Sequence, residues 1–488
     1  MAAVDIRPRA ARRGHRGKYV IALSALVVLV AIPFQAAGAI TRVNLWVKST
    51  GANTGNCKVQ ASPCATITYA LSQAPLTGTN INLLSDIADE VNVNKDNVTI
   101  LSSPATGLFS IRPITNTLVA QTPEGAAVAP IVYVGQSRSA IALKNIKIDG
   151  SARPTAGACD PGKGHTGLYV RSAQVTLSNT SVLNITQGAG LEGCQNGSAI
   201  YVRTDPSASS NVSITRGTVS GYDKNGITCN SVGTTCAITS TTVTGRGAVG
   251  LGDAAQNGIQ FGFGATGTIA SVTVSNNNYQ PTSDIATGIL LYNAGDGVLV
   301  KNSNLFGNNI NLDALNDGGG GTGQTTANLT VTTNKAHDAA ADIGNYAEGI
   351  TLDSLTNATV TSNTVYGNSE VGIAAWGIQA SNINSNNVND HSTADPNGDG
   401  IFVGGPGYAF PTSNGNNVNL NKSSRNTADG IHVDANTAGN TFSSNTMTRD
   451  GLFEAHDEST GGGSVGTANT WTTDHCSGGT SSPTGLCS

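Results

Sequence analysis

The sequence "GITLDSLTNATVTSNTVYGN" spans residues 349–368, and the similar stretch "GIAAWGIQASNINSNNV" spans residues 372–388. Ile350 and Ile373, the second residues of the two stretches, lie 23 positions apart. Aliphatic and polar residues alternate within each short run, which is the period of a β-strand with one buried face. Glycine, asparagine and serine between the runs predict turns. The two stretches therefore predict successive coils of a repeating β structure.

The same pattern covers most of the chain. A small residue followed by an inward-pointing aliphatic recurs at Leu168, Ile200, Ile227, Ile259, Ile289, Ile310, Ile350, Ile373, Ile401, Ile431 and Leu452. About ten residues later comes a pair of aliphatics five apart, as in Leu177 with Val182, Ile214 with Val219, Val300 with Leu305, Val360 with Val365, Ile383 with Val388, and Phe442 with Met447. The expected pair Leu420 and Arg425 does not fit the pattern.

A single coil cannot be stable alone. Its four or five aliphatics contribute roughly 1.5 to 3 kcal/mol each when buried. Ordering its backbone costs about 1 to 2 kcal/mol per residue. Coils become stable only when they stack, so that backbone groups pair between them and the aliphatic columns merge into one core. Parallel connections of this kind are overwhelmingly right-handed.

The "G-I-x-V" and "N-x-x-V-x-x-N-x-V" runs resemble those of secreted right-handed parallel β-helix proteins. That group comprises carbohydrate-binding and sugar-hydrolysing repeats and includes pectate-lyase-like enzymes. The resemblance covers roughly residues 98–476 and implies an all-β chain, a single-stranded right-handed parallel β-helix solenoid of about 11–13 coils. It is not specific for an activity, because the repeat describes a core rather than a site.

The ends of the chain predict a division into four parts. Residues 1–39 are expected to be a signal peptide, residues 40–97 an N-terminal cap with the first strands, residues 98–475 the β-helix, and residues 476–488 a disulfide-closed tail. The cap should contain a short amphipathic helix that begins near Ser62 and Pro63. Its apolar face consists of Ile67, Ala70, Leu71 and Ala74.

The signal-peptide prediction rests on the order of residue types. A basic stretch precedes an apolar run from Tyr19 to Phe34, and "AGA" ends at Ala39. The run is shorter than the roughly 20 residues that span a bilayer, and an uncleaved anchor is the alternative. We therefore expect a secreted protein, bacterial by its signal, with no transmembrane segment once the signal is removed.

Eight cysteines in an exported chain predict disulfides. Roughly a hundred connectivities are available to eight cysteines. Short spacing favours three local pairs, Cys57 with Cys64, Cys229 with Cys236, and Cys476 with Cys487, which leaves Cys159 for Cys194. The sequence alone does not decide among these connectivities.

The net charge of the chain excludes some classes of binding partner. The chain has 26 Lys and Arg and 31 Asp and Glu, and without residues 1–39 these become 20 and 30. The resulting charge near −10 argues against nucleic acid and anionic membranes as partners. A neutral or weakly acidic extracellular polysaccharide is the expected partner, bound by a monomer.

Residues on the outer face of the expected strands suggest a binding surface. Of the twenty-two outward positions in the eleven tetrapeptides, six are aromatic and predict substrate contacts: Tyr169, Tyr201, Tyr292, Trp376, Phe402 and Phe453. Insertions at residues 316–328, 335–348, 386–399 and 404–416 flank this stripe and would form the walls of an elongated groove. Aromatic rings stack on the apolar faces of sugars, so the groove suits a polymer.

Two acidic positions are candidate catalytic residues. In the expected register Asp313 and Asp353 occupy one outward column in successive coils, which places the two side chains about 5 Å apart. Such a pair could share a proton, act as acid and nucleophile in a retaining glycosidase, or hold Ca²⁺. An Asp and Asn ladder on a solvated face is the structural alternative. No other cofactor is indicated by the sequence.

His432 and Asp434 form a second candidate acid and base pair. They lie in "NTADGIHVD", residues 426–434, which resembles the "NTDG" signature of polygalacturonases but contains the additional residue Ala428. The remaining polygalacturonase motifs are absent from the sequence, which argues against that activity. No Lys or Arg lies beside the acidic stripe to serve as the base of a pectate lyase.

Two functions remain open on the sequence. The first is an exported β-helix that binds an extracellular polysaccharide and cleaves it with Asp313 and Asp353. The second is a non-enzymatic cell-surface or adhesion protein, which the low content of charged residues, 12%, and the abundant Asn, Ser and Thr also fit.

Overall fold

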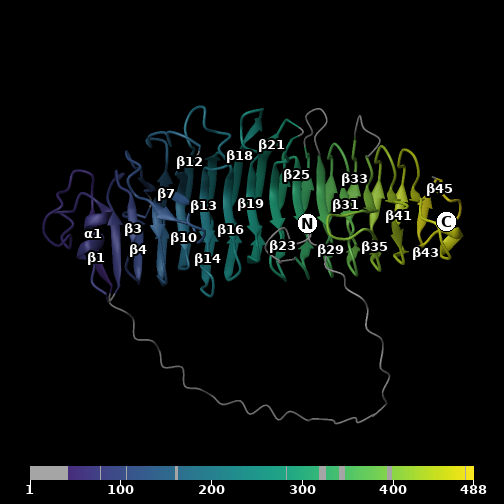
Figure 1. Ribbon diagram of the computed structural model, residues 1–488, viewed down its shortest axis with the longest axis horizontal. Helices are drawn as coiled ribbons and strands as arrows, with labels where there is room; N and C mark the ends of the chain where they lie inside the picture. Colours follow the sequence, from purple (N-terminus) through teal and green to yellow (C-terminus); the bar gives the residue numbers. More distant parts are fainter. Residues whose placement is uncertain are drawn as a thin grey trace, which may run out of the picture. The chain divides into compact units, whose positions relative to one another are not determined.

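The structure is a computed structural model. It describes residues 42–76, 78–105, 107–159, 163–281, 283–317, 326–339, 347–392, 398–478 and 480–488. The predicted signal peptide, residues 1–39, lies outside the described residues. Residues 41–488 form one compact unit of stacked strands, which run from α1 to β45 (Figure 1).

Three long parallel sheets make up this unit. The first contains, in spatial order, β1 (Val43–Val47), β2 (Thr79–Leu83), β4 (Val98–Ser102), β8 (Ile141–Lys144), β11 (Gln174–Ser178), β14 (Ser210–Thr215), β17 (Thr234–Thr239), β20 (Thr266–Ala270), β23 (Leu299–Lys301), β26 (Thr330–Thr332), β29 (Thr359–Thr361), β32 (Asn382–Asn384), β36 (Asn417–Asn419), β40 (Thr441–Ser443) and β43 (Thr470–Thr472). Its strands follow one another at the spacing of one coil.

The second sheet carries the candidate site. It contains β3 (Val91–Val93), β7 (Ala127–Val134), β10 (Gly164–Arg171), β13 (Ser198–Arg203), β16 (Asn225–Asn230), β19 (Asn257–Gly262), β22 (Thr287–Tyr292), β25 (Ile310–Leu315), β28 (Glu348–Asp353), β31 (Ile373–Trp376), β34 (Ile401–Gly404), β38 (Ile431–Val433), β42 (Ala455–Asp457) and β45 (Ser481–Ser482). A short strand, β6 (Ala120–Gln121), pairs antiparallel with β7.

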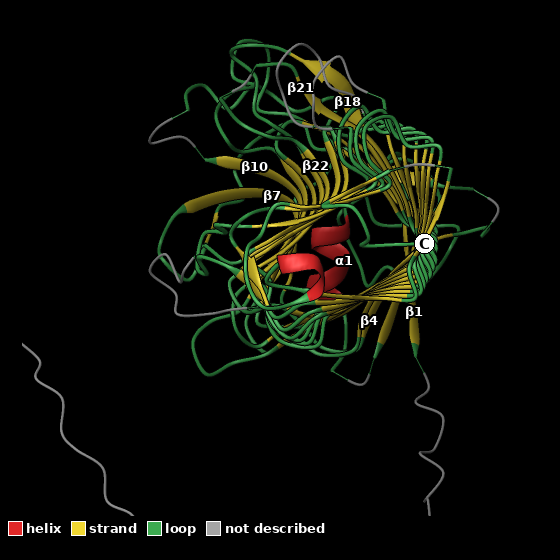
Figure 2. Cartoon of the chain, turned by 90° about the vertical axis from the view of Figure 1, so that its right-hand side faces the viewer, coloured by secondary structure: helices red, strands yellow, loops and turns green. Residues whose placement is uncertain are grey.

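The third sheet contains β5 (Phe109–Ile111), β9 (Ile146–Asp149), β12 (Ser181–Ile185), β15 (Thr218–Tyr222), β18 (Thr242–Val249), β21 (Thr273–Tyr279), β24 (Asn304–Phe306), β27 (Lys335–His337), β30 (Thr364–Tyr366), β33 (Asn387–Asn389), β37 (Lys422–Ser424), β41 (Thr446–Thr448) and β44 (His475–Ser477). A small sheet pairs β35 (Ser413–Asn414) with β39 (Thr437–Ala438). A view along the stack shows the three long sheets around a common interior (Figure 2).

The all-β right-handed solenoid expected from the sequence is therefore confirmed. Parallel pairing extends beyond the predicted range 98–475 at both ends, from β1 to β45. The longest sheets have 15 strands, more than the 11–13 coils expected, because the first coils lie within residues 43–97.

The helix of the N-terminal cap is α1 (Ile67–Gln73), with Ile67, Ala70 and Leu71 buried. It packs on β1, β2 and β3, so it covers the first coil as predicted. The N-cap is Thr66, whose hydroxyl accepts a hydrogen bond from the backbone N–H of Tyr69, and not Ser62. Near the other end of the chain lies a short 3-10 helix, Ser464–Gly466.

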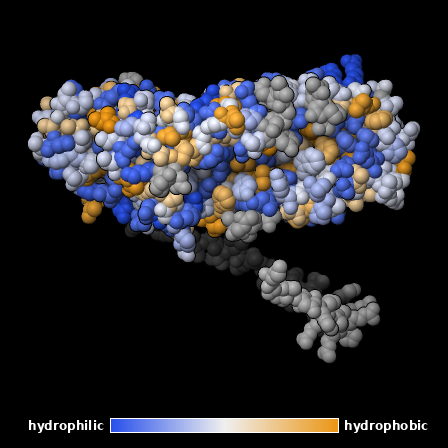
Figure 3. Space-filling model, turned by 45° about the horizontal axis from the view of Figure 1, so that its top comes forward, coloured by the Kyte–Doolittle hydropathy of each residue, from blue (hydrophilic) through white to orange (hydrophobic). Residues whose placement is uncertain are grey.

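The core follows the sequence pattern with two exceptions. Every aliphatic of the five-apart pairs is buried, and so are the tetrapeptide aliphatics except Leu452, which is 60% exposed. Ile310 is buried but is displaced by two residues in register, because Leu312 and not Ile310 aligns with Ile350. The face of the molecule seen in Figure 3 accordingly shows apolar residues in small patches among polar ones.

The coil that did not fit the sequence pattern uses different residues. Val418 and Ser423 occupy its two inward positions, while Leu420 lies in the turn with φ 57° and is 58% exposed. The pair is therefore five residues apart as elsewhere, but its second member is a serine. The Ser423 hydroxyl donates to the backbone carbonyl of Gly430, which satisfies it in the interior.

Buried asparagines form a ladder in the turns between the first and third sheets. Its members are Asn334, Asn363, Asn386, Asn421, Asn445 and Asp474, one from each successive coil. The Nδ2 group of Asn363, for example, donates both to the carbonyl of Val331 and to Oδ1 of Asn386. Each step joins neighbouring coils with side-chain bonds of about 3 Å, which satisfies polar groups that would otherwise be buried without partners.

The four disulfides join Cys57 to Cys64, Cys159 to Cys194, Cys229 to Cys236, and Cys476 to Cys487, as the spacing favoured. Four disulfides suit an extracellular or periplasmic protein. In the part of the chain that the structure describes, no helix has the length and apolar character needed to span a bilayer.

Candidate functional site

Register across three strands of the second sheet positions the candidate acids. Asp353 of β28 aligns with Trp376 of β31, as expected. Asp313 of β25, however, aligns with Thr351, and Asp353 aligns with Leu315. The prediction that both aspartates share one column is therefore wrong. The cause is the "NINL" run, in which the aligned aliphatic is Leu312 and not Ile310.

The corrected register separates the two acids diagonally. Adjacent strands lie about 4.8 Å apart and two residues span about 6.6 Å along a strand, so the Cα atoms of Asp313 and Asp353 are on the order of 8 Å apart. A third acid, Glu348, begins the same strand as Asp353 and aligns with Ile310. The acidic trio at this site therefore comprises Asp313, Glu348 and Asp353.

Burial distinguishes the members of the acidic trio. Asp313 is 7% exposed and Glu348 is 4% exposed, while Asp353 is half-buried. Glu348 accepts a short hydrogen bond from the hydroxyl of Thr351. Oδ1 of Asp353 accepts hydrogen bonds from the Ser354 hydroxyl at 2.6 Å and from the backbone N–H of Tyr408 at 2.9 Å. Within the described residues, the carboxyl group of Asp313 has no hydrogen-bond partner.

Desolvation raises the pKa of all three carboxyl groups. Burial, together with the charge of Asp353, raises the pKa of Asp313 to about 7. Burial and the charges of Glu370, Asp313 and Asp353 raise the pKa of Glu348 to about 8. Burial also raises the pKa of Asp353, although the bonds from Ser354 and Tyr408 oppose the shift. Two of the three carboxyl groups therefore hold protons near neutral pH.

The segment after β34 closes one side of the site. It turns at Gly407, whose N–H donates to the carbonyl of Phe410, and brings the N–H groups of Tyr408 and Ala409 onto Asp353 and Ser354. A Cβ atom at Gly407 would come within 2.6 Å of Oδ1 of Asp353, so only glycine permits this approach. The predicted insertion at residues 404–416 is thus a wall of the site.

The other three predicted insertions contain residues 318–325, 340–346 and 393–397, which lie outside the described residues.

A cavity of about 450 Å³ lies between this wall and the second sheet. Its lining comprises Ile285, Ile310, Asp313, Leu315, Glu348, Thr351, Asp353, Trp376, Pro406, Gly407 and Tyr408. The cavity therefore combines the three acids with an indole ring and a phenol. Within the described residues, the carboxylate oxygens of the trio do not form a three-ligand metal cluster.

Trp376 and Phe402 lie side by side on the outer face of the second sheet, as predicted. Their ring centroids are 4.3 Å apart, and Trp376 remains partly exposed while Phe402 is 8% exposed. Tyr292 lies in the same column as Asp353 and donates its hydroxyl to Asp317. This bond raises the pKa of Tyr292 to about 12.

The aromatic residues nearer the N-terminus are arranged differently. Tyr169 has no exposed surface, and its hydroxyl donates to the carbonyl of Gln121 in β6. It is stacked between Tyr133 and Tyr201 with centroids 5.5 Å apart on each side. The segment around β6 covers these rings, so Tyr169 offers no surface to a ligand. Tyr201 is partly exposed and its hydroxyl accepts a bond from Arg203.

The last aromatic position of the predicted stripe is displaced. In "GLFEAHD" the residue that aligns with Ile431 is Ala455, so the strand is β42 and His456 pairs with His432. Leu452 and Phe453 precede this strand, and Phe453 packs against His456 with centroids 4.9 Å apart. The register predicted for Phe453 is therefore wrong by three residues.

The predicted pair of His432 and Asp434 is not a hydrogen-bonded pair. His432 points its Nδ1 atom to Asp399 at 3.0 Å, and its ring meets Phe402 at 5.3 Å between centroids. Asp434 lies in the turn after β38, where its carboxylate accepts backbone bonds from Gly405 and Asn436. His432 therefore pairs with Asp399, and Asp434 stabilises the turn through its backbone hydrogen bonds.

Sequence reasoning missed Glu348 and Tyr408. Glu348 stands two residues before an aligned isoleucine, and the same position holds Asp399 and Asp429 in later coils. The runs "EGI" and "DGI" were therefore an available signal for a third outward column. Tyr408 depends on the fold of a loop, for which the repeat contains no information.

The comparison with known proteins agrees with the β-helix architecture. Residues 198–388 match the family model described as "Right handed beta helix region". No curated protein sequence matches the chain.

Several solved structures are similar at low identity. A structure of the periplasmic alginate epimerase AlgG has 10% identity and a TM-score of 0.44, covering 82% of this chain and 77% of that one. Pectate lyase Pel9A has 12% identity and a TM-score of 0.36, covering 83% and 77%. DFA-IIIase from Arthrobacter chlorophenolicus A6 has 12% identity and a TM-score of 0.45, covering 76% and 85%. On its strand topology and the family model, the chain has the fold of a right-handed parallel β-helix.

Proposed function

We propose that this protein binds an extracellular polysaccharide across the second sheet and hydrolyses it in the cavity that the acidic trio lines. The observation that carries the proposal is the unpartnered carboxyl group of Asp313, buried in the wall of that cavity with a pKa near 7. A buried acid that retains its proton at neutral pH is suited to general acid catalysis.

The roles of two acids follow from their surroundings. Asp313 gives its proton to the glycosidic oxygen as the bond from that oxygen to the anomeric carbon breaks. Asp353, fixed by Ser354 and Tyr408, takes a proton from the water whose oxygen bonds to that carbon. These roles are those of the inverting reaction, which leaves room for a water between two carboxyl groups about 6.5 to 9.5 Å apart. The diagonal register, with the Cα atoms on the order of 8 Å apart, supports this choice over two acids in one column.

Glu348 keeps the charge of the acidic trio low. With a pKa of about 8, Glu348 is mostly protonated at neutral pH and so adds little charge to the trio. The net charge of the chain also favours a neutral or weakly acidic glycan over a polyanion. Trp376 and Tyr408 offer ring faces to the sugar at the edge of the cavity.

The direct test is a screen of neutral and weakly acidic polysaccharides with the purified protein. Reducing ends released without an unsaturated, ultraviolet-absorbing product would indicate hydrolysis, and the anomeric configuration of the first product would distinguish inversion from retention. Unsaturated products would contradict the proposed hydrolysis. Glycan binding without any product would favour the adhesion function and would also contradict the catalytic proposal.

Replacement of Trp376 by alanine should weaken glycan binding about 10-fold, because one ring contact of about 0.5 to 1.5 kcal/mol is lost with part of its buried area. Binding can be measured by titration calorimetry with an oligosaccharide of the glycan that the screen identifies. Tyr366→Ala is the matched control, since Tyr366 is a partly exposed aromatic on the third sheet, stacked on His337. Equal losses in both variants would place the glycan elsewhere.

A further inference from the structure

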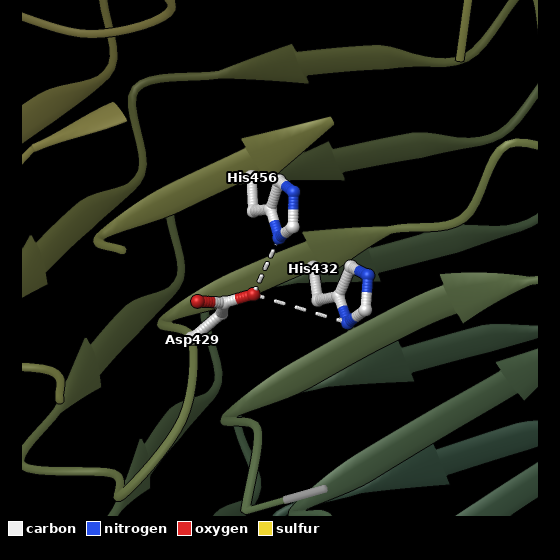
Figure 4. Close-up of side chains that lie close together, drawn as sticks. All are labelled: Asp429, His432 and His456. Carbon is white, nitrogen blue, oxygen red and sulfur yellow. Dashed lines mark hydrogen bonds and ion pairs between the residues drawn. The ribbon is translucent and has the colours of Figure 1, made fainter. Parts of the chain in front are cut away.

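Two histidines and two buried aspartates converge near the C-terminal end of the second sheet. Figure 4 shows Asp429 beside His432 and His456, which project from the neighbouring strands β38 and β42. Among the described residues, Asp429, His432 and His456 are the one group of three potential ligands whose atoms all lie within 4.8 Å of one another. Asp399, one coil earlier, completes a set of four.

We propose that this set is a metal site that selects Zn²⁺, held by Oδ2 of Asp399, Oδ2 of Asp429, Nδ1 of His432 and Nδ1 of His456. The proposal is independent of the hydrolytic function proposed for the acidic trio.

The distances between these atoms suit one small ion. His432 Nδ1 lies 3.0 Å from Asp399 Oδ2 and 3.9 Å from Asp429 Oδ2, and His456 Nδ1 lies 2.8 Å from Asp429 Oδ2. Four ligands at about 2.0 to 2.1 Å from a tetrahedral ion are about 3.3 Å apart, which is close to the mean of these separations. Asp399 is joined to this group through His432, while the ligand atoms of Asp429, His432 and His456 all lie within 4.8 Å of one another.

The surroundings hold the ligands in place. The second oxygen of Asp399 accepts the N–H of Asp429, and the second oxygen of Asp429 accepts the N–H of Phe453. The side chains of both aspartates are 4% exposed, so each carboxylate is oriented by the backbone and largely removed from water. A divalent cation would neutralise the charges of the two buried carboxylates.

The outer nitrogens of the two rings face a common carboxylate. The rings are stacked with centroids 4.9 Å apart, and Nε2 of His432 and Nε2 of His456 lie 3.7 and 3.9 Å from Oε1 of Glu458. Within the described residues, Nε2 of His432 is buried and has no hydrogen-bond partner. Metal-bound histidines commonly donate their other N–H to a carboxylate, and Glu458 is placed to accept both.

The ligand types select the metal. Two imidazole nitrogens with two carboxylate oxygens suit Zn²⁺, whereas Ca²⁺ and Mg²⁺ prefer ligand sets made of oxygen alone. The four ligands come from three successive coils, those of β34, β38 and β42. A bound ion would therefore fasten these coils together beside Phe402, whose ring contacts His432.

The test is Zn²⁺ binding by the purified protein after chelator treatment, followed by titration calorimetry. We expect one ion per chain at micromolar Zn²⁺, and at least about 100-fold weaker binding in Asp429→Asn and in His456→Gln. His337→Gln is the control, because His337 lies on the third sheet and is not one of the proposed ligands. Its affinity should equal that of the unmutated protein.

A second readout avoids the question of whether the variants fold. In the unmutated protein, the imidazole nitrogen resonances of His432 and His456 should shift on Zn²⁺ addition while those of His337 do not. Absence of stoichiometric Zn²⁺ binding, binding that survives both substitutions, or preference for Ca²⁺ over Zn²⁺ would each overturn the proposal.

Discussion

Asp313→Asn is expected to lower kcat for glycan hydrolysis by about 10² to 10⁴-fold, the usual contribution of a general acid. KM should change little, because the amide keeps the size of the side chain and loses only the transferable proton. The measurement is the initial rate of reducing-end release. The unmutated protein should also lose activity as pH rises through about 7, where Asp313 gives up its proton.

The matched control is Asp434→Asn, which replaces an aspartate in the turn after β38 that lies outside the cavity lining. The Asp434→Asn variant should retain most of the activity, although the sequence had indicated Asp434 as a candidate catalytic residue. Equal activity in Asp313→Asn and the unmutated protein would exclude Asp313 as the acid. A rate that stays constant from roughly one pH unit below to two units above the expected pKa would do the same.

Asp313→Asn is also expected to stabilise the folded protein in mild alkali. The pKa of Asp313 rises from 3.8 to about 7 on folding, and that of Glu348 from 4.5 to about 8. A raised carboxyl pKa means that the folded state holds the proton more tightly than the unfolded state. The stability that each proton contributes is therefore full below about pH 4 and is lost as pH rises through 7 to 8.

The size of this effect follows from the shifts. At about 1.4 kcal/mol per pKa unit, a shift of roughly three units corresponds to about 4 kcal/mol as an upper value for each carboxyl group. Asp313→Asn and Glu348→Gln should each raise the free energy of unfolding at pH 8.5 by on the order of 2 to 4 kcal/mol, and by much less at pH 5. Guanidinium unfolding curves at the two pH values measure the difference.

Asp296→Asn is the control for stability, since Asp296 is an exposed carboxylate in the turn after β22. It should change the free energy of unfolding little at either pH. If Asp313→Asn were equally stabilising at pH 5 and pH 8.5, the buried charge would not be the cause. A variant that is more stable and less active would also fit the common finding that a catalytic acid is held at a cost to stability.

The repeat made the fold predictable, because inward aliphatics recur at fixed spacing and few other structures bury them. Short spacing favoured the local cysteine pairs that the structure contains, although the sequence alone did not decide the connectivity. The helix of the N-terminal cap followed from the spacing of Ile67, Ala70 and Leu71. These features depend on local sequence or on its repetition.

The site was predictable only in part, because register depends on a choice that the repeat leaves open at irregular coils. In β25 both Ile310 and Leu312 could be the aligned aliphatic. The structure aligns Leu312 with Ile350, whereas Ile310 aligns with Glu348 and lines the cavity. The column of Asp313 was therefore misplaced although its outward direction was correct. In β42 the aligned residue is Ala455, which is too small to stand out beside Leu452.

The contacts of the wall could not be predicted at all. Tyr408 reaches Asp353 because the turn at Gly407 folds the chain back across the sheet, and this path depends on tertiary packing. The shifts in pKa likewise depend on how deeply each carboxyl group is buried. The alternation of residues indicates only whether a side chain points inward or outward, and not its depth.

In the asparagine ladder each side chain donates to the member in the next coil, and the series ends at Asp474. The side-chain amide of each asparagine donates one hydrogen bond to a carbonyl of the preceding coil and one to the side chain of the following coil. An asparagine in the last coil would therefore have an N–H donor without an acceptor. An aspartate carries acceptors only, and Asp474 accepts both bonds from Asn445 without needing anything beyond itself. The chemistry of one side chain thus marks where the addition of coils stops, and it leaves no unpaired amide donor at that edge onto which another chain could extend the ladder.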